Sequence, residues 1–337
     1  MHFDKLLENI KKDNDINNLF MNIINPFSTY LICDHFIGTE LKELNIKVPI
    51  FKNNLLVTKN IDIIRDYDIL LVESTKFDIF IETFLPRIKK KIVLITGYWQ
   101  WPQIYKSEKT DYVLNHPNIF LWVSQNPIYQ NHPKYMPFPY GICHCNLIKY
   151  AEQLLLENNK TRLVEFLPIQ NSTNPCRSKL PELEKMKSED FYKKMGEAEF
   201  LLSPIGDRDD CYRHYECIGL GTIPISNIGD TYKPIFNENM YYCDIDQMVT
   251  ILDTGITDCS YSIPNRDLIC YEYYRDMVFN RISELRKKYG PNPSGPSSVP
   301  YRGAMNQLLS SPMETVVEQK TSYVNNSYIR KFKIIFN

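Results

Sequence analysis

The stretch that decides the fold is "FLLSPIGDRDDCYRHYECIGLGTIPI", residues 200–225. It opens on a short apolar run, passes through a glycine turn, and ends on a second apolar run that is rich in β-branched residues. Between the two runs we expect a helix from about Asp210 to Leu220, with Asp209 as its N-cap. Gly221, directly before the second run, favours a helix packed tightly on a sheet. The stretch therefore predicts a strand, a helix and a second strand of one parallel sheet.

The same alternation of short apolar runs and amphipathic segments continues on both sides of this stretch. Strands are expected at 29–33 (Thr29 to Cys33), 47–56, 67–74, 91–99 and 118–127, and then at 161–169, 222–227 and 240–252. Helices are expected at 76–91, 146–159, 176–186 and 188–199, and within 261–290, where Gly290 is the expected stop. Short buried strands that alternate with helices are typical of parallel sheets covered by helices, so the chain is predicted to be α/β.

The alternation starts afresh near residues 145–160, so two successive Rossmann-like domains are expected. The N-terminal domain covers residues 1–150 and the C-terminal domain 151–290, while 291–337 hold a linker, "PNPSGPSSVP", and a tail of unclear role. Two such domains in series hold ligands in a cleft between the carboxyl ends of their parallel sheets. Chemistry is then expected in the loops that follow strands.

Composition limits the partners and the compartment. The 337 residues carry 39 Lys and Arg against 40 Asp and Glu, a net charge of −1, which argues against nucleic acid or an anionic membrane as a partner. Nine cysteines without a paired framework indicate reduced thiols in the cytoplasm. No apolar run approaches the roughly 20 residues that span a bilayer, so no membrane span is expected.

Two short patterns resemble metal ligands. Cys143, His144 and Cys145 form a tight cluster, but the cluster lacks a second ligand pair at zinc spacing. Asp207 and Asp209 reproduce an Asp-x-Asp metal motif, which is interpreted here as turn and cap chemistry. Neither pattern predicts a metal site.

Three charged residues recur at intervals of three in the expected helix, at Asp210, Arg213 and Glu216, and they fall within about 120° of its circumference. An anion is favoured near a helix N-terminus, where Arg213 could add a bidentate fork for a phosphate. Glu216, further along the helix, could accept hydrogen bonds from the vicinal hydroxyls of a ribose. Spacing alone equally permits a solvated helix face with an ion pair between Asp210 and Arg213.

The stretch resembles the C-terminal signature of the exostosin-like glycosyltransferases: an apolar strand, Ser-Pro, a glycine turn, Asp-Cys-x-Arg-x-x-Glu, and then Gly-x-Ile-Pro-Ile. The matching residues are Ser203, Pro204, Gly206, Asp210, Cys211, Arg213, Glu216, Gly221, Ile223, Pro224 and Ile225. "YDILLVES", "DYVLNHPNIFLWVSQN" and "KYMPFPYGI" resemble the N-terminal half of related enzymes of large DNA viruses. "EFLPIQNSTNPCRSKL" resembles their loop, here with Thr173, Asn174 and Arg177. The resemblance covers roughly residues 28–250.

This resemblance implies a GT-B fold, in which two Rossmann-like domains with parallel sheets face an interdomain cleft. The C-terminal domain would hold the nucleotide-sugar donor and the N-terminal domain the acceptor. Glu216 would bind the ribose. The diphosphate would lie against Arg213, Arg177 and the Ser203–Gly206 turn, and the donor set is completed by Thr173, Asn174 and Asp210. Golgi exostosins carry a membrane anchor that this chain lacks, so the expected location is the cytoplasm, that of the host cell for a viral protein.

The catalytic base and the acceptor site are expected in the N-terminal domain. Inverting GT-B enzymes often place the base after the first strand, where Asp34 and His35 follow the expected strand; a capping Asp and a surface His fit these residues equally. Tyr98, Trp99 and Trp101 follow the expected strand 91–99 and offer aromatic platforms for an acceptor sugar, with buried packing as the alternative.

These observations predict a hexosyl- or pentosyltransferase that moves a sugar from a nucleotide-sugar, UDP-linked, to a glycan or another hydroxyl acceptor. The reaction is expected to be inverting and to need neither a divalent metal nor another cofactor. Two alternatives stay open. One is a non-catalytic GT-B-like protein that binds carbohydrate or acts as a scaffold, and the other is an epimerase of UDP-sugars on the same fold.

Overall fold

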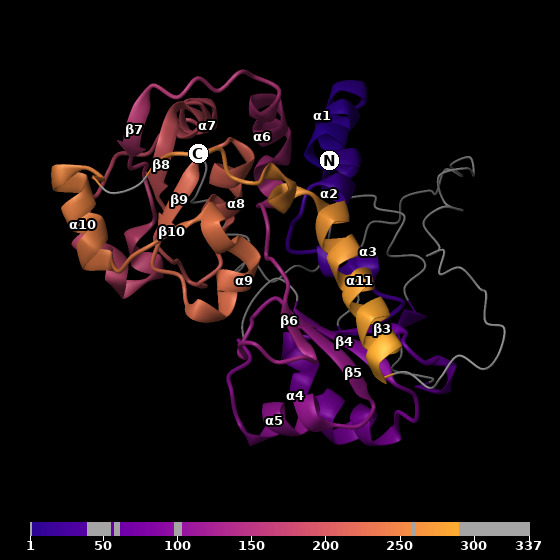
Figure 1. The fold of residues 1–337 in the computed structure, drawn as a ribbon. Helices are drawn as coiled ribbons and strands as arrows, with labels where there is room; N and C mark the ends of the chain where they lie inside the picture. Colours follow the sequence, from indigo (N-terminus) through magenta and orange to yellow (C-terminus); the bar gives the residue numbers. More distant parts are fainter. Residues whose placement is uncertain (1, 39–54, 57–60, 98–102, 258–259, 290–337) are drawn as a thin grey trace, which may run out of the picture. The chain divides into compact units, whose positions relative to one another are not determined.

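A computed structural model describes residues 2–38, 55–56, 61–97, 103–257 and 260–289. Among them the chain forms two sheets in which every described pair of neighbouring strands is parallel. Helices alternate with the strands along the chain (Figure 1). The expected α/β class with parallel sheets is confirmed. No helix in the described ranges is both long and apolar enough to cross a bilayer.

The first sheet has six strands in the order β2-β1-β3-β4-β5-β6. Its strands are β1 (His35–Ile37), β2 (Leu55–Leu56), β3 (Ile69–Glu73), β4 (Ile92–Gly97), β5 (Ile119–Ser124) and β6 (Tyr135–Pro137). The central strands β3, β4 and β5 are buried at every position, as expected for a parallel sheet covered on both faces. The strands predicted at 67–74 and 118–127 are therefore confirmed, and so is the described part of the strand predicted at 91–99.

The helical segments of this part are α1 (His2–Lys12), α2 (Ile16–Asn22), α3 (Ser28–Ile32), α4 (Phe77–Ile79), which continues to Arg87 as π and 3-10 turns, and α5 (Glu108–Asn115). Of these, α3 contacts β3 and α5 contacts β5, whereas α1 and α2 pack on each other. One apolar cluster packs Phe77, Phe80 and Leu85 against strand side chains such as Leu94 and Trp122. The predicted helix 76–91 thus exists, but its hydrogen-bonding pattern changes twice along its length.

The second sheet has four strands in the order β10-β9-β8-β7. Its strands are β7 (Arg162–Glu165), β8 (Ala198–Leu202), β9 (Ile223–Ser226) and β10 (Tyr241–Tyr242). The helices of this part are α6 (Leu147–Leu154), α7 (Ser188–Glu197), α8 (Tyr212–Gly219), α9 (Lys233–Phe236), α10 (Ile245–Thr254) and α11 (Tyr271–Tyr289). Figure 1 shows α8 beside β9, the strand that follows it in the chain. The opening stretch is therefore a strand, a helix and a strand of one parallel sheet, as predicted.

Three predicted elements are wrong. The predicted strand Thr29 to Cys33 is instead the helical turn α3 up to Ile32, with Cys33 as its C-cap. The backbone N–H of Ser28 bonds the Asn25 carbonyl, and the Ser28 hydroxyl accepts from the Asn25 N–H. A short buried run cannot be assigned to strand or helix by periodicity alone. Residues 240–252 form only a two-residue strand, since the Asp244 capping box starts α10. Residues 176–186 form no α-helix beyond a 3-10 turn, Pro175–Lys179.

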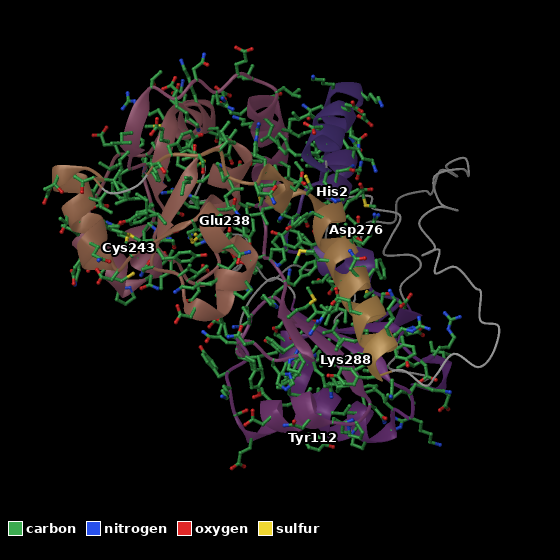
Figure 2. The ribbon with its side chains drawn as sticks, viewed as in Figure 1. His2, Tyr112, Glu238, Cys243, Asp276 and Lys288 are labelled. Atoms are coloured by element: carbon green, nitrogen blue, oxygen red, sulfur yellow. The ribbon has the colours of Figure 1, made fainter. Side chains whose placement is uncertain are left out.

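The N-terminal residues are tied to the start of the last helix. Ile24 donates to the Ile269 carbonyl, and Phe3 donates to the Asp267 carboxylate. His2 on α1 lies 3.8 Å from Asp276 on α11 (Figure 2). A helix that the sequence assigns to the C-terminal domain therefore packs on the first residues of the chain. The division at residue 150 stays a prediction, and Gly290 and the tail 291–337 lie outside the described residues.

Candidate functional site

The helix of the opening stretch begins two residues later than predicted. It starts at Tyr212, and Cys211, rather than Asp209, occupies the N-cap. The Cys211 backbone N–H donates to Nδ1 of His214, and the His214 N–H returns the bond to the Cys211 carbonyl. Residues 207–210 form a bend instead of a first turn. The loop that joins β8 to α8 is therefore longer than expected, and it carries the charged residues.

Asp210 is buried inside this loop, with 0% exposure. Its Oδ2 accepts from the backbone N–H of Tyr140 at 2.7 Å and from the Tyr215 hydroxyl at 2.9 Å. Oδ1 is also buried and has no hydrogen-bond partner, and it lies 4.0 Å from Nδ1 of His214. Asp210 thus ties the segment after β6 to α8. Neither a solvated helix face nor an ion pair with Arg213 describes it.

The buried Asp210 carboxylate predicts a pH-dependent stability. Burial raises its pKa from 3.8 to about 6, so the folded chain holds this proton more tightly than the unfolded chain. The stabilisation from protonated Asp210 is complete below pH 4 and is lost as the pH rises through 6. Asp210→Asn removes this dependence and keeps an oxygen for Tyr140 and Tyr215. Between pH 4 and pH 7, the unfolding free energy of the variant should therefore gain about 2 kcal/mol relative to the parent. Urea unfolding at both pH values measures the difference in unfolding free energy between the variant and the parent. If that difference does not change with pH, the prediction is wrong.

Both predicted donor-site arginines use their guanidinium N–H groups for hydrogen bonds within the chain. Arg177 is buried and donates to the carbonyls of Pro204 and Ile205, to the Gln170 carbonyl and to the Thr173 hydroxyl. Arg213 is half-buried and donates to the carbonyls of Leu167 and Pro168, after β7. In this arrangement both side chains shape the loops at the carboxyl ends of β7 and β8. Their predicted contacts with a diphosphate stay untested.

The remaining loop residues of the predicted donor set support the same structure. The Asn174 side-chain amide donates to the Gly206 carbonyl at 2.8 Å. A Cβ on Gly206 would meet Nη2 of Arg177 at 3.0 Å, so glycine permits this close approach. Ser203 is fully buried and continues the sheet ladder through its N–H to Ile225. The structure therefore brings Thr173, Asn174, Arg177, Ser203 and Gly206 together at one edge of the second sheet.

Glu216 is a buried carboxylate with spare acceptor capacity. It is 7% exposed, and Oε1 accepts from the Tyr192 hydroxyl at 3.0 Å. Within the described ranges no hydrogen bond is formed by Oε2. Burial raises the pKa of Glu216, and the nearby Arg213 charge acts in the opposite direction. Arg213 and Glu216 thus both lie on α8, whereas Asp210 lies in the loop before that helix.

Arg208 is a loop residue that the sequence reasoning missed. Its guanidinium carbon lies 3.9 Å from the ring centroid of Tyr140, which stacks on Tyr212. Nη2 donates to the Gln125 carbonyl at 3.3 Å, and Nε is buried without an acceptor in the described structure. Of the three arginines around this loop, Arg208 forms the fewest hydrogen bonds to the chain. The sequence feature that could have identified Arg208 is its position between Asp207 and Asp209.

The predicted base does not lie in a loop after a strand. His35 is the first residue of β1, and Asp34 precedes it, so both lie at the amino end of the sheet. Nε2 of His35 lies 2.7 Å from Oδ2 of Asp68, and both side chains are buried. Oδ2 of Asp34 accepts from the Ile69 N–H. The placement was wrong because the preceding run is helical; the catalytic role itself is untested.

Glu73 lies at the carboxyl end of a strand, the end of the sheet at which chemistry was expected. It is the last residue of β3, a central strand, and it is 6% exposed. Its Oε1 accepts from the Thr75 hydroxyl at 2.7 Å, and a Cβ on Gly38, just after β1, would meet Oε2 at 2.8 Å. An acidic residue that ends a buried apolar run was the signal for it. The predicted acceptor residues Tyr98, Trp99 and Trp101 lie outside the described residues.

A shallow surface hollow lies away from all these residues. It has a volume of about 380 Å³ and lies along α5, where Tyr112 is seen in Figure 2. Its lining is Glu108, Asp111, Tyr112, Asn115, His116 and Pro117. None of the predicted site residues contributes to it, so the candidate site is defined by the motif and its contacts.

No family model matches this chain, and no curated protein matches it. Among solved structures, it is similar to a chain of the GtfA/B complex, with a TM-score of 0.36 and 12% identical residues. The similarity covers 66% of this chain and 58% of that one, so the chain spans less than two thirds of its neighbour. A likeness at this level carries no argument about the fold or the function of this chain. The resemblance to exostosin-like glycosyltransferases, viral members included, therefore rests on the motif.

Proposed function

We propose that this chain is a glycosyltransferase that takes a sugar from a nucleotide-sugar, UDP-linked, and passes it to a hydroxyl acceptor such as a glycan. The observation that carries the proposal is Glu216. This buried carboxylate lies beside Arg213 and keeps one oxygen without a described hydrogen bond. It sits on the helix between two adjacent parallel strands, and an acidic residue in a βαβ unit is suited to the hydroxyls of a ribose.

The diphosphate would lie at the loop between β8 and α8. Arg208 offers it guanidinium donors that the chain does not use, and Arg213 adds positive charge nearby. Arg177 and Asn174 would act indirectly, because their hydrogen bonds hold the carbonyls of residues 204–206 in place. Fixed donors and arginine charge stabilise a leaving diphosphate without a metal ion. The reaction would accordingly be metal-independent. We propose further that it inverts the anomeric centre, by direct attack of the acceptor hydroxyl, in a GT-B-like arrangement with the acceptor on the N-terminal side.

The proposal predicts that Glu216→Gln weakens nucleotide binding about 10- to 100-fold, the loss expected for charge-assisted hydrogen bonds from two hydroxyls. Glutamine keeps the acceptor for Tyr192, so the fold should persist. Thermal-shift titrations of the parent with UDP, GDP and their sugars would identify the donor, and calorimetry would then give the Kd of each variant. Glu189→Gln, an exposed carboxylate on α7 with a surface ion pair to Lys149, is the matched control.

The same titrations can contradict the proposal. If no nucleotide or nucleotide-sugar raises the melting temperature of the parent chain, the donor site is wrong. Binding without release of the nucleotide or transfer would favour the carbohydrate-binding or scaffold alternative. Conversion of the sugar while it stays on UDP would favour the epimerase. Equal affinity in Glu216→Gln and the parent would remove the ribose role from Glu216.

A further inference from the structure

The turn before α6 gathers three soft ligand groups. The 3-10 turn His144–Asn146 contains His144 and Cys145, and Cys143 is its N-cap. One ligand atom from each of the three residues lies within 4.8 Å of the other two. Sequence spacing alone gave no metal prediction here because a second pair of ligands is missing. What the folded turn adds is the convergence of one ligand atom from each of the three residues. Three converging ligands are the number that zinc sites with an open position use.

The separations suit a single ion. Zinc bonds of about 2.3 Å to sulfur and 2.0–2.1 Å to nitrogen place tetrahedral ligands about 3.6 Å apart for S and N, and about 3.8 Å apart for two S atoms. Nε2 of His144 lies 3.6 Å from Sγ of Cys145. The limit of 4.8 Å for all pairs leaves the remaining distances within reach of small side-chain rotations.

The surroundings hold two of the ligands in place and leave the third accessible. Cys143 is buried, whereas Cys145 is exposed and gives an ion access from the surface. The His144 ring packs edge-on against Phe27 at 5.4 Å between centroids, which limits its orientations. All three residues belong to the turn that starts α6, and the Tyr150 hydroxyl on α6 donates to the Glu216 carbonyl.

We propose that Cys143, His144 and Cys145 bind one thiophilic cation, Zn²⁺ or Cu⁺, through two thiolates and one imidazole. Both ions favour this ligand set: zinc would keep a fourth, solvent position, and monovalent copper would be three-coordinate. The site does not depend on the proposed sugar transfer. Because the ion would join the buried end of the turn to its exposed end, it would stabilise the start of α6.

Cobalt substitution tests the site directly. The full chain is reduced, freed of metal with a chelator and titrated with Co²⁺, which gives thiolate-to-cobalt absorption in the near ultraviolet when bound by cysteine. Zn²⁺ is then added to displace it, and Cu⁺ is titrated in competition with a chromophoric chelator. We expect one equivalent of Co²⁺ to bind. Cys145→Ser and His144→Ala should each weaken binding at least about tenfold, because loss of even an outer-shell partner costs 10–100-fold.

Matched controls are needed because the chain has nine cysteines. Cys176→Ser and Cys243→Ser change partly buried cysteines elsewhere, of which Cys243 is labelled in Figure 2. Neither control should alter the absorption or the affinity. Displacement by Zn²⁺, or capture of Cu⁺ from the chelator, identifies the ion. Absorption that persists unchanged in Cys145→Ser and His144→Ala overturns the proposal, as does a parent chain that binds none of the three ions.

Discussion

If the chain transfers sugars as proposed and Glu73 is the general base, Glu73→Gln is expected to lower the turnover number by about 10²- to 10⁴-fold, the usual contribution of such a base. The affinity for the nucleotide-sugar should stay that of the parent chain. The substitution keeps the shape of the side chain and an oxygen for the Thr75 hydroxyl, and it removes the carboxylate as a proton acceptor. Steady-state assays of nucleotide release, with and without an acceptor, measure the effect.

The position of Glu73 is the reason for this expectation. In open parallel sheets, ligands bind outside the carboxyl ends of the strands. Glu73 ends a central strand, and the Ser74 hydroxyl beside it donates to the Gly97 carbonyl at the end of β4. The three aromatic residues predicted to hold the acceptor follow Gly97 in the sequence. A base at Glu73 would therefore end β3, the strand next to β4, and the aromatic residues follow β4 in the sequence.

His35→Gln separates this placement from the one that the sequence suggested. His35 lies at the opposite, amino end of the sheet and is paired with Asp68, so its loss should reduce stability and leave kcat close to that of the parent. Glu82→Gln, at an exposed acid of the neighbouring helical segment, is the control for a simple loss of charge. A large fall in kcat for His35→Gln with a normal kcat for Glu73→Gln would return the base to His35.

The sequence was sufficient for those parts of the fold where long buried runs set the pattern. β3, β4 and β5 come from runs of four or five apolar or β-branched residues, which are typical of strands in a covered parallel sheet. Prediction failed where short runs were ambiguous. The residues 29–33 are apolar enough for a strand, yet bonds between Asn25 and Ser28 turn them into a helix. Asp244 similarly ended a predicted strand after two residues.

The sequence placed the candidate donor residues in the loops after β7 and β8 and on α8, but it did not predict the direction of their side chains. Helical spacing put Asp210 and Arg213 on one face, but Asp210 bonds Tyr140, which lies 70 residues away in the sequence. Such a partner leaves no mark in local periodicity. Glu216 keeps the buried, partly unsatisfied position that its expected role needs. The number of acceptors around each arginine, which distinguishes Arg208 from the others, is likewise a property of the tertiary structure.

Arg177→Ala is expected to lower the free energy of unfolding by about 3 kcal/mol, because several buried carbonyls lose their donor at once. Arg177 bonds Pro204 and Ile205 in one loop and Gln170 and Thr173 in another. Arg177→Lys should recover only part of this loss, since an ammonium group cannot reproduce the planar fork. Urea unfolding measures both variants. Arg162→Ala, with an exposed ion pair to Glu165, should cost no more than about 1 kcal/mol.

The outcome decides between two roles for the same residue. As a structural residue, Arg177 affects the donor site through the loop 204–206, so stability and nucleotide affinity should fall together in Arg177→Ala. As a direct ligand of the diphosphate, the role that the family motif implied, its removal would weaken nucleotide binding while the unfolding free energy stayed that of the parent. The geometry favours the first result because every described hydrogen bond of the guanidinium ends on the chain itself. A stable Arg177→Ala protein that no longer binds nucleotide would overturn this assignment and place the arginine on the phosphates.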